Sequence, residues 1–259
     1  MTGIITAALL VGGVGLVIGI LLSIAAKVFA VKIDENEIAI REILPGNNCG
    51  GCGYAGCDGL AKAIAAGEAP AGACPVGGSS VAEQIGKIMG TEGEMVKKVA
   101  FVKCGGDCSK AKDKYEYTGN KSCREANYVS GGPKGCSYGC MGFGSCVQVC
   151  EFDAISVVDG IAVVDKEKCV ACGKCVKECP KGLISLVPYS AKHLVQCSSK
   201  DKGKEVMSVC SAGCIGCSLC AKNCPKDAIV FENNLAVIDY EKCVNCGICA
   251  QKCPKKIIV

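Results

Sequence analysis

The feature that most constrains this chain is a cysteine motif, C-x2-C-x2-C-x3-C-P, which occurs at residues 169–180, 214–225 and 243–254. Its first three cysteines are spaced to bind three corners of one iron-sulfur cubane. The fourth, which precedes proline, turns away toward a second cluster. A zinc knuckle uses cysteines in pairs and has no role for the third. The spacing therefore predicts iron-sulfur clusters and a fold built around them.

The 25 cysteines among 259 residues raise the alternative of a disulfide framework. Nearly all of them fall in tight C-x2-C or C-x3-C groups, and residues two or three apart are poorly placed to bridge each other. The chain has no tryptophan and only 5 phenylalanines, so an aromatic core does not hold it together. We therefore expect reduced cysteines that bind metal in a reducing compartment.

From residue 123 onward the sequence repeats itself in a constant register. Residues 153–181 align with 227–255, and the upstream cysteines at 123, 136, 140, 146 and 150 align with those at 197, 210, 214, 220 and 224. Within each copy two β-rich runs flank a turn, as in ISVV-DG-IAVV at 155–164, which is typical of a β-hairpin. The repeat predicts two equivalent modules.

A separate cysteine element begins with NNCGGCGYAGC at residues 47–57. Its candidate ligands are Cys49, Cys52, Cys57 and Cys74. The glycines between them let the backbone wrap a bulky inorganic core and direct N–H groups at its sulfurs. A four-cysteine zinc knuckle is the alternative for this element. Upstream, Ile33, Ile40 and Leu44 share one face of a predicted helix that ends before Pro45.

The first 26 residues contain no charged side chain and exceed the ~20 apolar residues that span a bilayer core. A cleaved signal peptide would carry a basic region ahead of its apolar run, and none precedes this one. Lys27 and Lys32 follow the run, so the positive-inside rule places the rest of the chain in the cytoplasm. We therefore predict a single-pass anchor in the cell (inner) membrane, with the lipid bilayer as a partner and the cluster-bearing part in the cytoplasm.

The chain offers little for substrate chemistry. His193 is its only histidine, and no Walker loop or strand-linked G-x-G-x-x-G occurs, so we expect no catalytic residue and no nucleotide site. The formal charge of +4 counts thiols as neutral. Five four-thiolate clusters at roughly −2 each would change it to about −6, so no nucleic-acid partner is expected. Many one-electron centres without substrate chemistry predict an electron conductor.

The repeated motif resembles that of bacterial ferredoxins with two [4Fe-4S] clusters, and the resemblance implies crossed ligation. The implied sets are Cys214, Cys217, Cys220 with Cys253; Cys243, Cys246, Cys249 with Cys224; and Cys169, Cys172, Cys175 with Cys150. The remaining site departs from the pattern, because Phe143 stands at the position of Cys217 and Glu151 replaces the proline. Its best assignment is Cys136, Cys140 and Cys146 with Cys179.

Five cysteines remain outside these sets: Cys104, Cys108, Cys123, Cys197 and Cys210. The stretch CGGDC at 104–108 has ligand-like glycines, so Cys104, Cys108 and Cys123 are candidates for one further cluster. Free thiols are the alternative, since cysteine is commonly buried. We expect five [4Fe-4S] clusters and leave a further one open.

The order of the segments along the chain resembles the order found in one protein family. An uncharged N-terminal span, EILPGNNCGGCGYAGC with Cys74 ahead of PVGG, and ferredoxin repeats together resemble the B subunit of the Rnf complex, an ion-translocating ferredoxin:NAD+ oxidoreductase. The resemblance covers essentially the whole chain. It implies a membrane-anchored subunit that accepts electrons from reduced ferredoxin and relays them within an ion-pumping translocase, with no substrate-converting site of its own. The implied partners are reduced ferredoxin and the other membrane and soluble subunits, which carry flavin and NAD sites.

Two other classes of function stay open on the sequence alone. One is a polyferredoxin-like relay subunit of another membrane redox enzyme, such as a hydrogenase. The other is a zinc-stabilised interaction protein without a redox role.

The predicted fold class is α+β, with an N-terminal transmembrane helix, a small α-helical four-cysteine domain and tandem two-cluster ferredoxin-like modules. The expected boundaries are 1–31 for the anchor, 32–92 for the four-cysteine domain, 93–122 for a cysteine-containing linker, 123–188 for the first module and 189–259 for the second.

Overall fold

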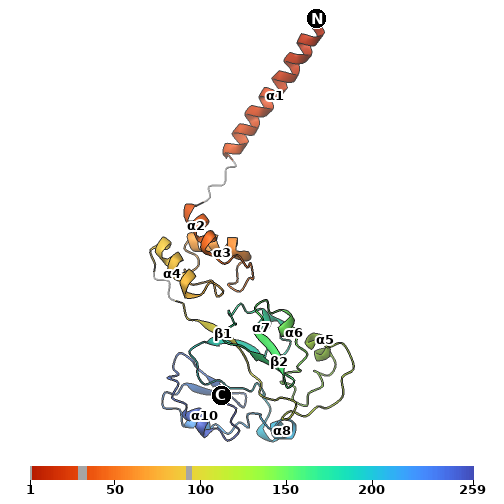
Figure 1. Cartoon of the computed structure of the whole chain (residues 1–259), viewed down its shortest axis with the longest axis vertical. Coiled ribbons are helices and arrows are strands. Elements are labelled where there is room, and N and C mark those ends of the chain that lie inside the picture. Colours follow the sequence, from red (N-terminus) through yellow and green to blue (C-terminus); the bar gives the residue numbers. More distant parts are fainter. Residues whose placement is uncertain (1, 29–33, 92–94) are drawn as a thin grey trace.

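The computed structural model describes residues 2–28, 34–91 and 95–259, without the side chains of residues 2, 4–8, 26 and 28. Helix α1 (Thr2–Val28) extends away from the other elements (Figure 1). Its large apolar side chains from Leu9 to Ile24 are at least half exposed. Among the described residues, no helix is found with both the length and the apolar character needed to cross a membrane. The membrane span stays a prediction, and the expected boundaries after residues 31 and 92 lie outside the described residues.

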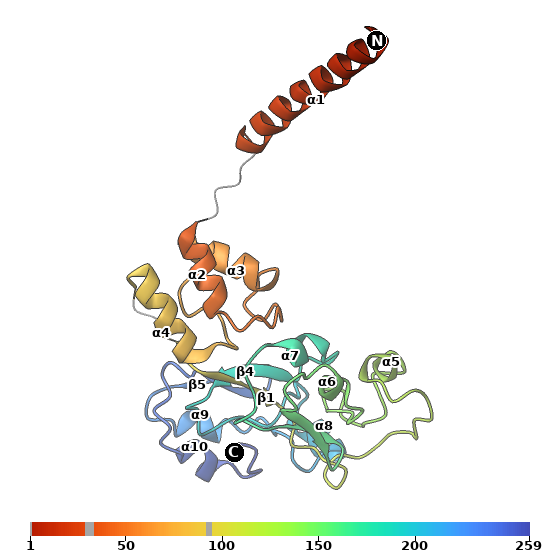
Figure 2. The same cartoon turned by 45° about the horizontal axis from the view of Figure 1, so that its top comes forward.

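The four-cysteine domain is helical, as expected. It consists of α2 (Glu35–Ile43), α3 (Gly56–Ala65) and α4 (Gly78–Met89), and α2 packs against both of the others (Figure 2). Asp34 caps α2, because its carboxylate accepts a hydrogen bond of 2.9 Å from the backbone N–H of Asn36. Ile40 and Leu44 are both buried, which confirms the predicted apolar face for these two residues, and the third predicted residue, Ile33, lies outside the described residues.

The two modules repeat the same structure. The first contains α6 (Ser145–Gln148), the hairpin β2 (Ile155–Val158) and β3 (Ile161–Val164), and α7 (Lys174–Glu178). The second contains α9 (Leu219–Lys222), the hairpin β5 (Ile229–Glu232) and β6 (Leu235–Ile238), and α10 (Ile248–Lys252). The predicted hairpin at 155–164 is confirmed, and both hairpins pair in the same register. In each module the two short helices pack on each other, α6 on α7 and α9 on α10.

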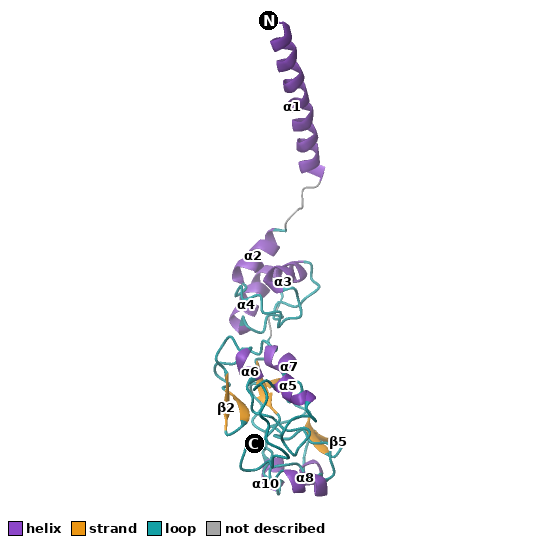
Figure 3. Ribbon diagram, turned by 90° about the vertical axis from the view of Figure 1, so that its right-hand side faces the viewer, coloured by secondary structure: helices purple, strands orange, loops and turns teal. Residues whose placement is uncertain are grey.

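A third two-stranded sheet joins the segment that precedes the first module to a strand of that module. Strand β1 (Lys98–Val102) pairs antiparallel with β4 (Ile184–Pro188), so residues expected to form a linker complete the module. In the second module the isolated bridge between Val195 and Ile258 takes the same place. The helices α5 (Cys123–Tyr128) and α8 (Gly203–Val209) complete this part of the chain, and α8 lies at the end of the molecule opposite to α1 (Figure 3).

Many of the cysteine side chains form part of the hydrophobic core. Cys57 and Cys74 are buried together with Leu60, Ile64 and Ile85 in the helical domain. Similar mixed clusters of cysteine and aliphatic side chains lie inside each module. The mixed α and β composition agrees with the predicted α+β class, and the core of each part is arranged around thiols.

Candidate iron-sulfur sites

In the helical domain the structure holds what we call the Cys49 group, which consists of Cys49, Cys52, Cys57 and Cys74. Asn48 fixes the start of α3, because its side-chain oxygen accepts a hydrogen bond of 2.8 Å from the backbone N–H of Cys57. The backbone N–H of Gly77 donates to Cys74 Sγ at 3.4 Å. Burial raises the pKa of the Cys74 thiol, and the neighbouring Cys57 and Cys52 add to the increase. At least three of the four expected ligands therefore lie close together.

In the first module one group contains Cys150, Cys169, Cys172 and Cys175, and we call it the Cys169 group. Burial and, after it, the charges of the other three thiols of the group, which lie close by, raise the pKa of the Cys175 thiol to about 11. The backbone N–H of Ala100 on β1 donates to Cys169 Sγ at 3.3 Å. The structure thus brings together the four cysteines implied by crossed ligation.

The second group of this module differs from the sequence-based assignment. A pocket of about 380 Å³ is lined by Cys123, Cys140, Cys146 and Cys179, which we call the Cys146 group. Burial raises the pKa of the Cys146 thiol to about 12, with further contributions from the other three thiols of the group. Cys123, at the start of α5, thus stands where Cys136 was expected, and Cys136 lies in a different pocket.

In the second module a pocket of about 330 Å³ is lined by Cys214, Cys217, Cys220 and Cys253, the Cys214 group. Burial raises the pKa of the Cys220 thiol to about 11, and the other three thiols contribute to the increase. This group has the composition that the ferredoxin resemblance implied.

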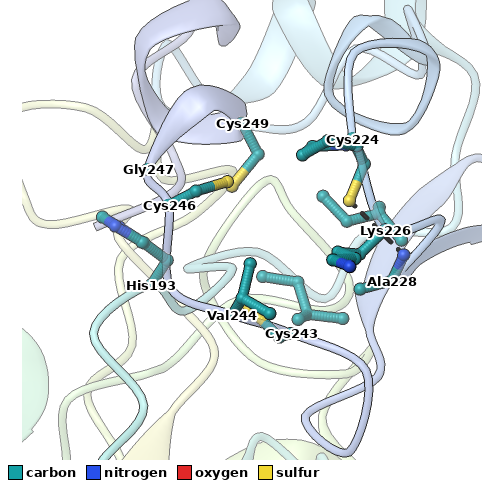
Figure 4. Close-up of a pocket in the computed structure, with 12 residues that line it drawn as sticks. His193, Cys224, Lys226, Ala228, Cys243, Val244, Cys246, Gly247 and Cys249 are labelled. Atoms are coloured by element: carbon teal, nitrogen blue, oxygen red, sulfur yellow. Dashed lines mark hydrogen bonds between the residues drawn. The ribbon is translucent and has the colours of Figure 1, made fainter.

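The last expected group, the Cys243 group, lines a pocket of about 370 Å³ near the C-terminus and consists of Cys224, Cys243, Cys246 and Cys249. Figure 4 shows the sulfurs of Cys224 and Cys249 on opposite sides of this pocket, with Cys243 below them. The backbone N–H of Ala228 donates to Cys224 Sγ at 3.3 Å. His193 lines the same pocket beside Gly247 (Figure 4), so the single histidine lies at a cysteine group.

A further pocket, of about 390 Å³, was not expected in this form. Its lining includes Cys104, Cys136, Cys197 and Cys210, which we call the Cys104 group, and also Cys140 of the Cys146 group. Burial and, after it, the charges of the other three thiols of the group raise the pKa of the Cys136 thiol to about 11. The remaining cysteine, Cys108, is exposed. The three cysteines proposed for an additional cluster, Cys104, Cys108 and Cys123, are therefore not brought together as one group.

The helical domain contacts the first module through its cysteine loop. A Cβ atom built on Gly51 would lie 2.6 Å from the carbonyl oxygen of Cys172, so only glycine permits this approach. Cys49 also lies near enough to Cys172 to contribute to the raised pKa of that thiol, after burial, which is the main cause. The Cys49 and Cys169 groups are therefore neighbours in space.

The thiol-lined pockets have the ligand type that an iron-sulfur cluster requires. Each of four pockets is lined by at least four thiols, and backbone N–H groups point at several of the sulfurs. Among the described residues, no set of three or more His, Cys, Asp or Glu side chains is arranged to hold a metal ion. Cysteine sulfurs supported by N–H donors are the ligand environment of iron-sulfur clusters.

Comparison with known families supports the same chemistry. A family model for an Fe-S cluster matches residues 44–76, and a model of the 4Fe-4S dicluster domain matches residues 168–228 and 213–257. The first of the two dicluster matches combines the motifs at 169–180 and 214–225, whereas in the structure α9 of the latter motif packs on α10. The matches thus recognise the motifs, and the tertiary structure shows which of them share a module.

Similar proteins cover most of the chain. The B subunit of the Na+-translocating ferredoxin:NAD+ oxidoreductase complex of Acetobacterium woodii is 54% identical over 90% of this chain and 71% of its own length. The chain belongs to the family of Rnf B subunits. The B subunit of the proton-translocating ferredoxin:NAD+ oxidoreductase complex of Clostridium ljungdahlii is 43% identical over 87% of this chain and 81% of its own length. The B subunit of the ion-translocating oxidoreductase complex of Methanosarcina acetivorans is 46% identical over 89% and 88%.

Membership of the family of Rnf B subunits confirms the resemblance drawn from the order of motifs. The chain is an iron-sulfur electron-transfer subunit with 4Fe-4S ferredoxin domains, and its relatives are subunits of an oxidoreductase complex. A relay subunit of another membrane enzyme, such as a hydrogenase, is not favoured.

Proposed function

We propose that this chain accepts electrons from reduced ferredoxin and relays them within an ion-pumping ferredoxin:NAD+ oxidoreductase complex. The observation that carries the proposal is the succession of neighbouring cysteine groups from the helical domain into the first module. The Cys49 group adjoins the Cys169 group at Gly51, and Cys175 lies close enough to Cys146 to raise the pKa of its thiol further. A row of neighbouring one-electron sites is what a conductor requires.

Five of the groups are the proposed cluster ligands. They are the Cys49, Cys169, Cys146, Cys214 and Cys243 groups, with Cys123 in place of Cys136 in the Cys146 group. A [4Fe-4S] cluster, when bound, accepts and releases one electron. The protein would hold it through four thiolates and would adjust its reduction potential with N–H donors such as that of Leu183, which lies 3.4 Å from Cys179 Sγ.

Helix α1 is the proposed membrane anchor. It is 27 residues long, and its described large apolar side chains are exposed rather than packed on the rest of the chain. Exposed apolar surface on this scale is stable only when another apolar phase or partner covers it. Lys27 in its last turn supports a cytoplasmic position for the clusters, and Rnf subunits are membrane-associated.

Purification under strictly anaerobic conditions tests the redox function. We expect broad visible absorption that dithionite bleaches, with iron and acid-labile sulfide in equal amounts and at least about 20 of each per chain, four for each of five clusters. The matched control is the same preparation exposed to air, which should lose both iron and colour. A colourless protein rich in zinc would contradict the proposal.

The choice of complex is tested by purification in mild detergent. The proposal expects flavin-containing membrane subunits and a soluble NAD-binding subunit to co-purify, and reduced ferredoxin to reduce the clusters of the isolated complex. A version that lacks residues 1–28 should lose the membrane subunits or the membrane fraction while it retains its iron. Co-purification with a nickel enzyme instead would favour a different relay.

A further inference from the structure

The Cys104 group lies outside every C-x2-C-x2-C-x3-C-P motif, yet its pocket resembles those of the motif groups. At about 390 Å³ it is similar in volume to the pockets of the Cys146, Cys214 and Cys243 groups, at about 380, 330 and 370 Å³. Cys104, Cys136, Cys197 and Cys210 are all buried, and the half-buried Cys140 of the Cys146 group lines the same pocket. A pocket of this size with four converging thiols has the same ligand set as the proposed cluster sites.

The four cysteines come in two equivalent pairs, one from each module. Val102 pairs with Ile184 in the first module, and Val195 pairs with Ile258 in the second. Ile184 and Ile258 are related by the sequence repeat, so Cys104 and Cys197, each two positions after its valine, are structural counterparts. Cys136 and Cys210 are related by the same repeat.

The contacts around the group are reciprocal, as expected where two copies of one module face each other. The backbone N–H of Gly105 donates to the carbonyl oxygen of Gln196 at 3.0 Å. The counterpart of Gly105 is Ser198, whose hydroxyl donates to the carbonyl oxygen of Lys103 at 2.9 Å. The pocket therefore lies at the interface between the modules.

The sulfurs of this group also accept backbone hydrogen bonds at equivalent places. The backbone N–H of Cys140 donates to Cys104 Sγ at 3.4 Å, and that of Cys214 donates to Cys197 Sγ at 3.3 Å. Cys140 and Cys214 are themselves members of the neighbouring Cys146 and Cys214 groups. One peptide unit on each side therefore connects the interface pocket to a proposed cluster site of each module.

A buried cation lines the same pocket. The side chain of Lys134 is only 5% exposed, and its ammonium lies 3.2 Å from the carboxylate of Asp113, which is largely exposed. A buried charge is costly unless it is compensated nearby. A cluster with four thiolates carries a net negative charge of roughly two, so it would compensate this ammonium more fully than a solvent-exposed carboxylate does.

We propose that Cys104, Cys136, Cys197 and Cys210 hold a sixth [4Fe-4S] cluster, shared by the two modules, which connects the Cys146 group to the Cys214 group. The inference extends the proposed relay function and depends on it only for the role of the cluster, not for its presence. Each transfer moves one electron and no atom or proton. The neighbouring cluster that gives the electron is oxidised by one electron, and the interface cluster is reduced by one, before it passes the electron on.

The direct test compares Cys210→Ala with Cys108→Ala in the full-length protein, purified anaerobically. The wild type should contain about 24 iron atoms per chain, and Cys210→Ala about four fewer, with an equal loss of sulfide. Cys108→Ala is the matched control, because it removes a cysteine that lies outside all six groups, and it should lose none. Unchanged iron in Cys210→Ala, loss of a cluster in Cys108→Ala, or stoichiometric zinc that disappears with Cys210 would each overturn the proposal.

If Cys210→Ala fails to fold, Lys134→Met provides a second test that keeps every ligand. Removing a positive charge beside a cluster makes its reduction harder, so the potential of one cluster should become more negative while iron content stays that of the wild type. Unchanged potentials for all clusters in a redox titration followed by EPR would overturn the proposal. A wild type with about 20 iron atoms and normal bleaching also overturns it, yet leaves the proposed function standing, whereas a colourless protein overturns the latter.

Discussion

The two modules share a backbone but differ in how they complete one of their cysteine groups. In the second module the motif itself supplies Cys217, whereas the first has Phe143 at that position, and the ring of Phe143 packs on Tyr117 with centroids 5.3 Å apart. The group in the first module contains Cys123 from α5 instead. Four thiols are thus retained, although one comes from a residue outside the motif.

An insertion makes this exchange possible. The stretch of chain from Cys104 to Cys136 is more than twice as long as the stretch between their counterparts, Cys197 and Cys210. The backbone at the exchanged position is unchanged, because Gly142 and Gly144 have positive φ like their counterparts Gly216 and Ser218. The comparison teaches that a cluster site constrains the number and place of its thiols more strongly than their order in the sequence.

Loss of a crossed ligand should have the largest effect, and the same effect in both modules. Cys253→Ala removes a thiol from the Cys214 group, although its sequence neighbours belong to the Cys243 group. We expect loss of the EPR signal of the cluster in the Cys214 group, with about four iron atoms, while that of the Cys243 group persists. Cys179→Ala should act in the same way on the Cys146 group. Selective loss of the Cys243-group cluster in Cys253→Ala would break the comparison.

The next prediction concerns Cys123, the ligand that replaces a motif cysteine in the first module. Its net effect is smaller, because a second substitution should compensate for the loss of this thiol. Cys123→Ala should lose the cluster of the Cys146 group, and adding Phe143→Cys should restore much of it, since the backbone there matches that around Cys217. Iron content and EPR of the single and double variants measure the restoration. Phe143→Cys alone is the matched control and should keep its full iron content. A Cys123→Ala variant with wild-type iron would show that the two modules do not differ in the way described.

The smallest expected effect is a change with pH in the free energy of unfolding of the protein without clusters. Burial raises the pKa of the equivalent thiols Cys146 and Cys220 to about 12 and about 11. The folded state therefore binds more protons than the unfolded state above about pH 9, so the free energy of unfolding should fall from about pH 9 to about pH 11. Urea unfolding of the metal-free, reduced protein at several pH values measures this.

The control for the pH effect is Cys146→Ser, because serine does not titrate in this range. Its free energy of unfolding should fall less steeply with pH than that of the wild type. A free energy that rises over the same range in the wild type would contradict the assigned direction. With clusters bound, iron holds the sulfurs as thiolates, and the dependence on these thiols should disappear.

Local sequence determined the chemistry of this protein and most of its elements. The motif spacing predicted iron-sulfur ligation, the two β-rich runs that flank a turn in ISVV-DG-IAVV predicted a hairpin that the structure confirms, and the order of motifs along the chain indicated the family. The motif and the hairpin each follow from residues close to one another in the chain, so their geometry is encoded locally. The sequence repeat also aligned Cys136 with Cys210, and this alignment indicated that the two cysteines of the interface pocket are equivalent.

Only the tertiary structure decided which distant thiols meet. The repeat aligned Cys123 with Cys197, because the insertion lies between Cys104 and Cys123, whereas strand pairing shows that Cys104 is the counterpart of Cys197. Strand registers and the packing of one module on the other are set by contacts between residues far apart in the chain, and spacing within a motif carries no information about them. The kind of ligand is therefore determined by the sequence, and the grouping of ligands is a property of the fold.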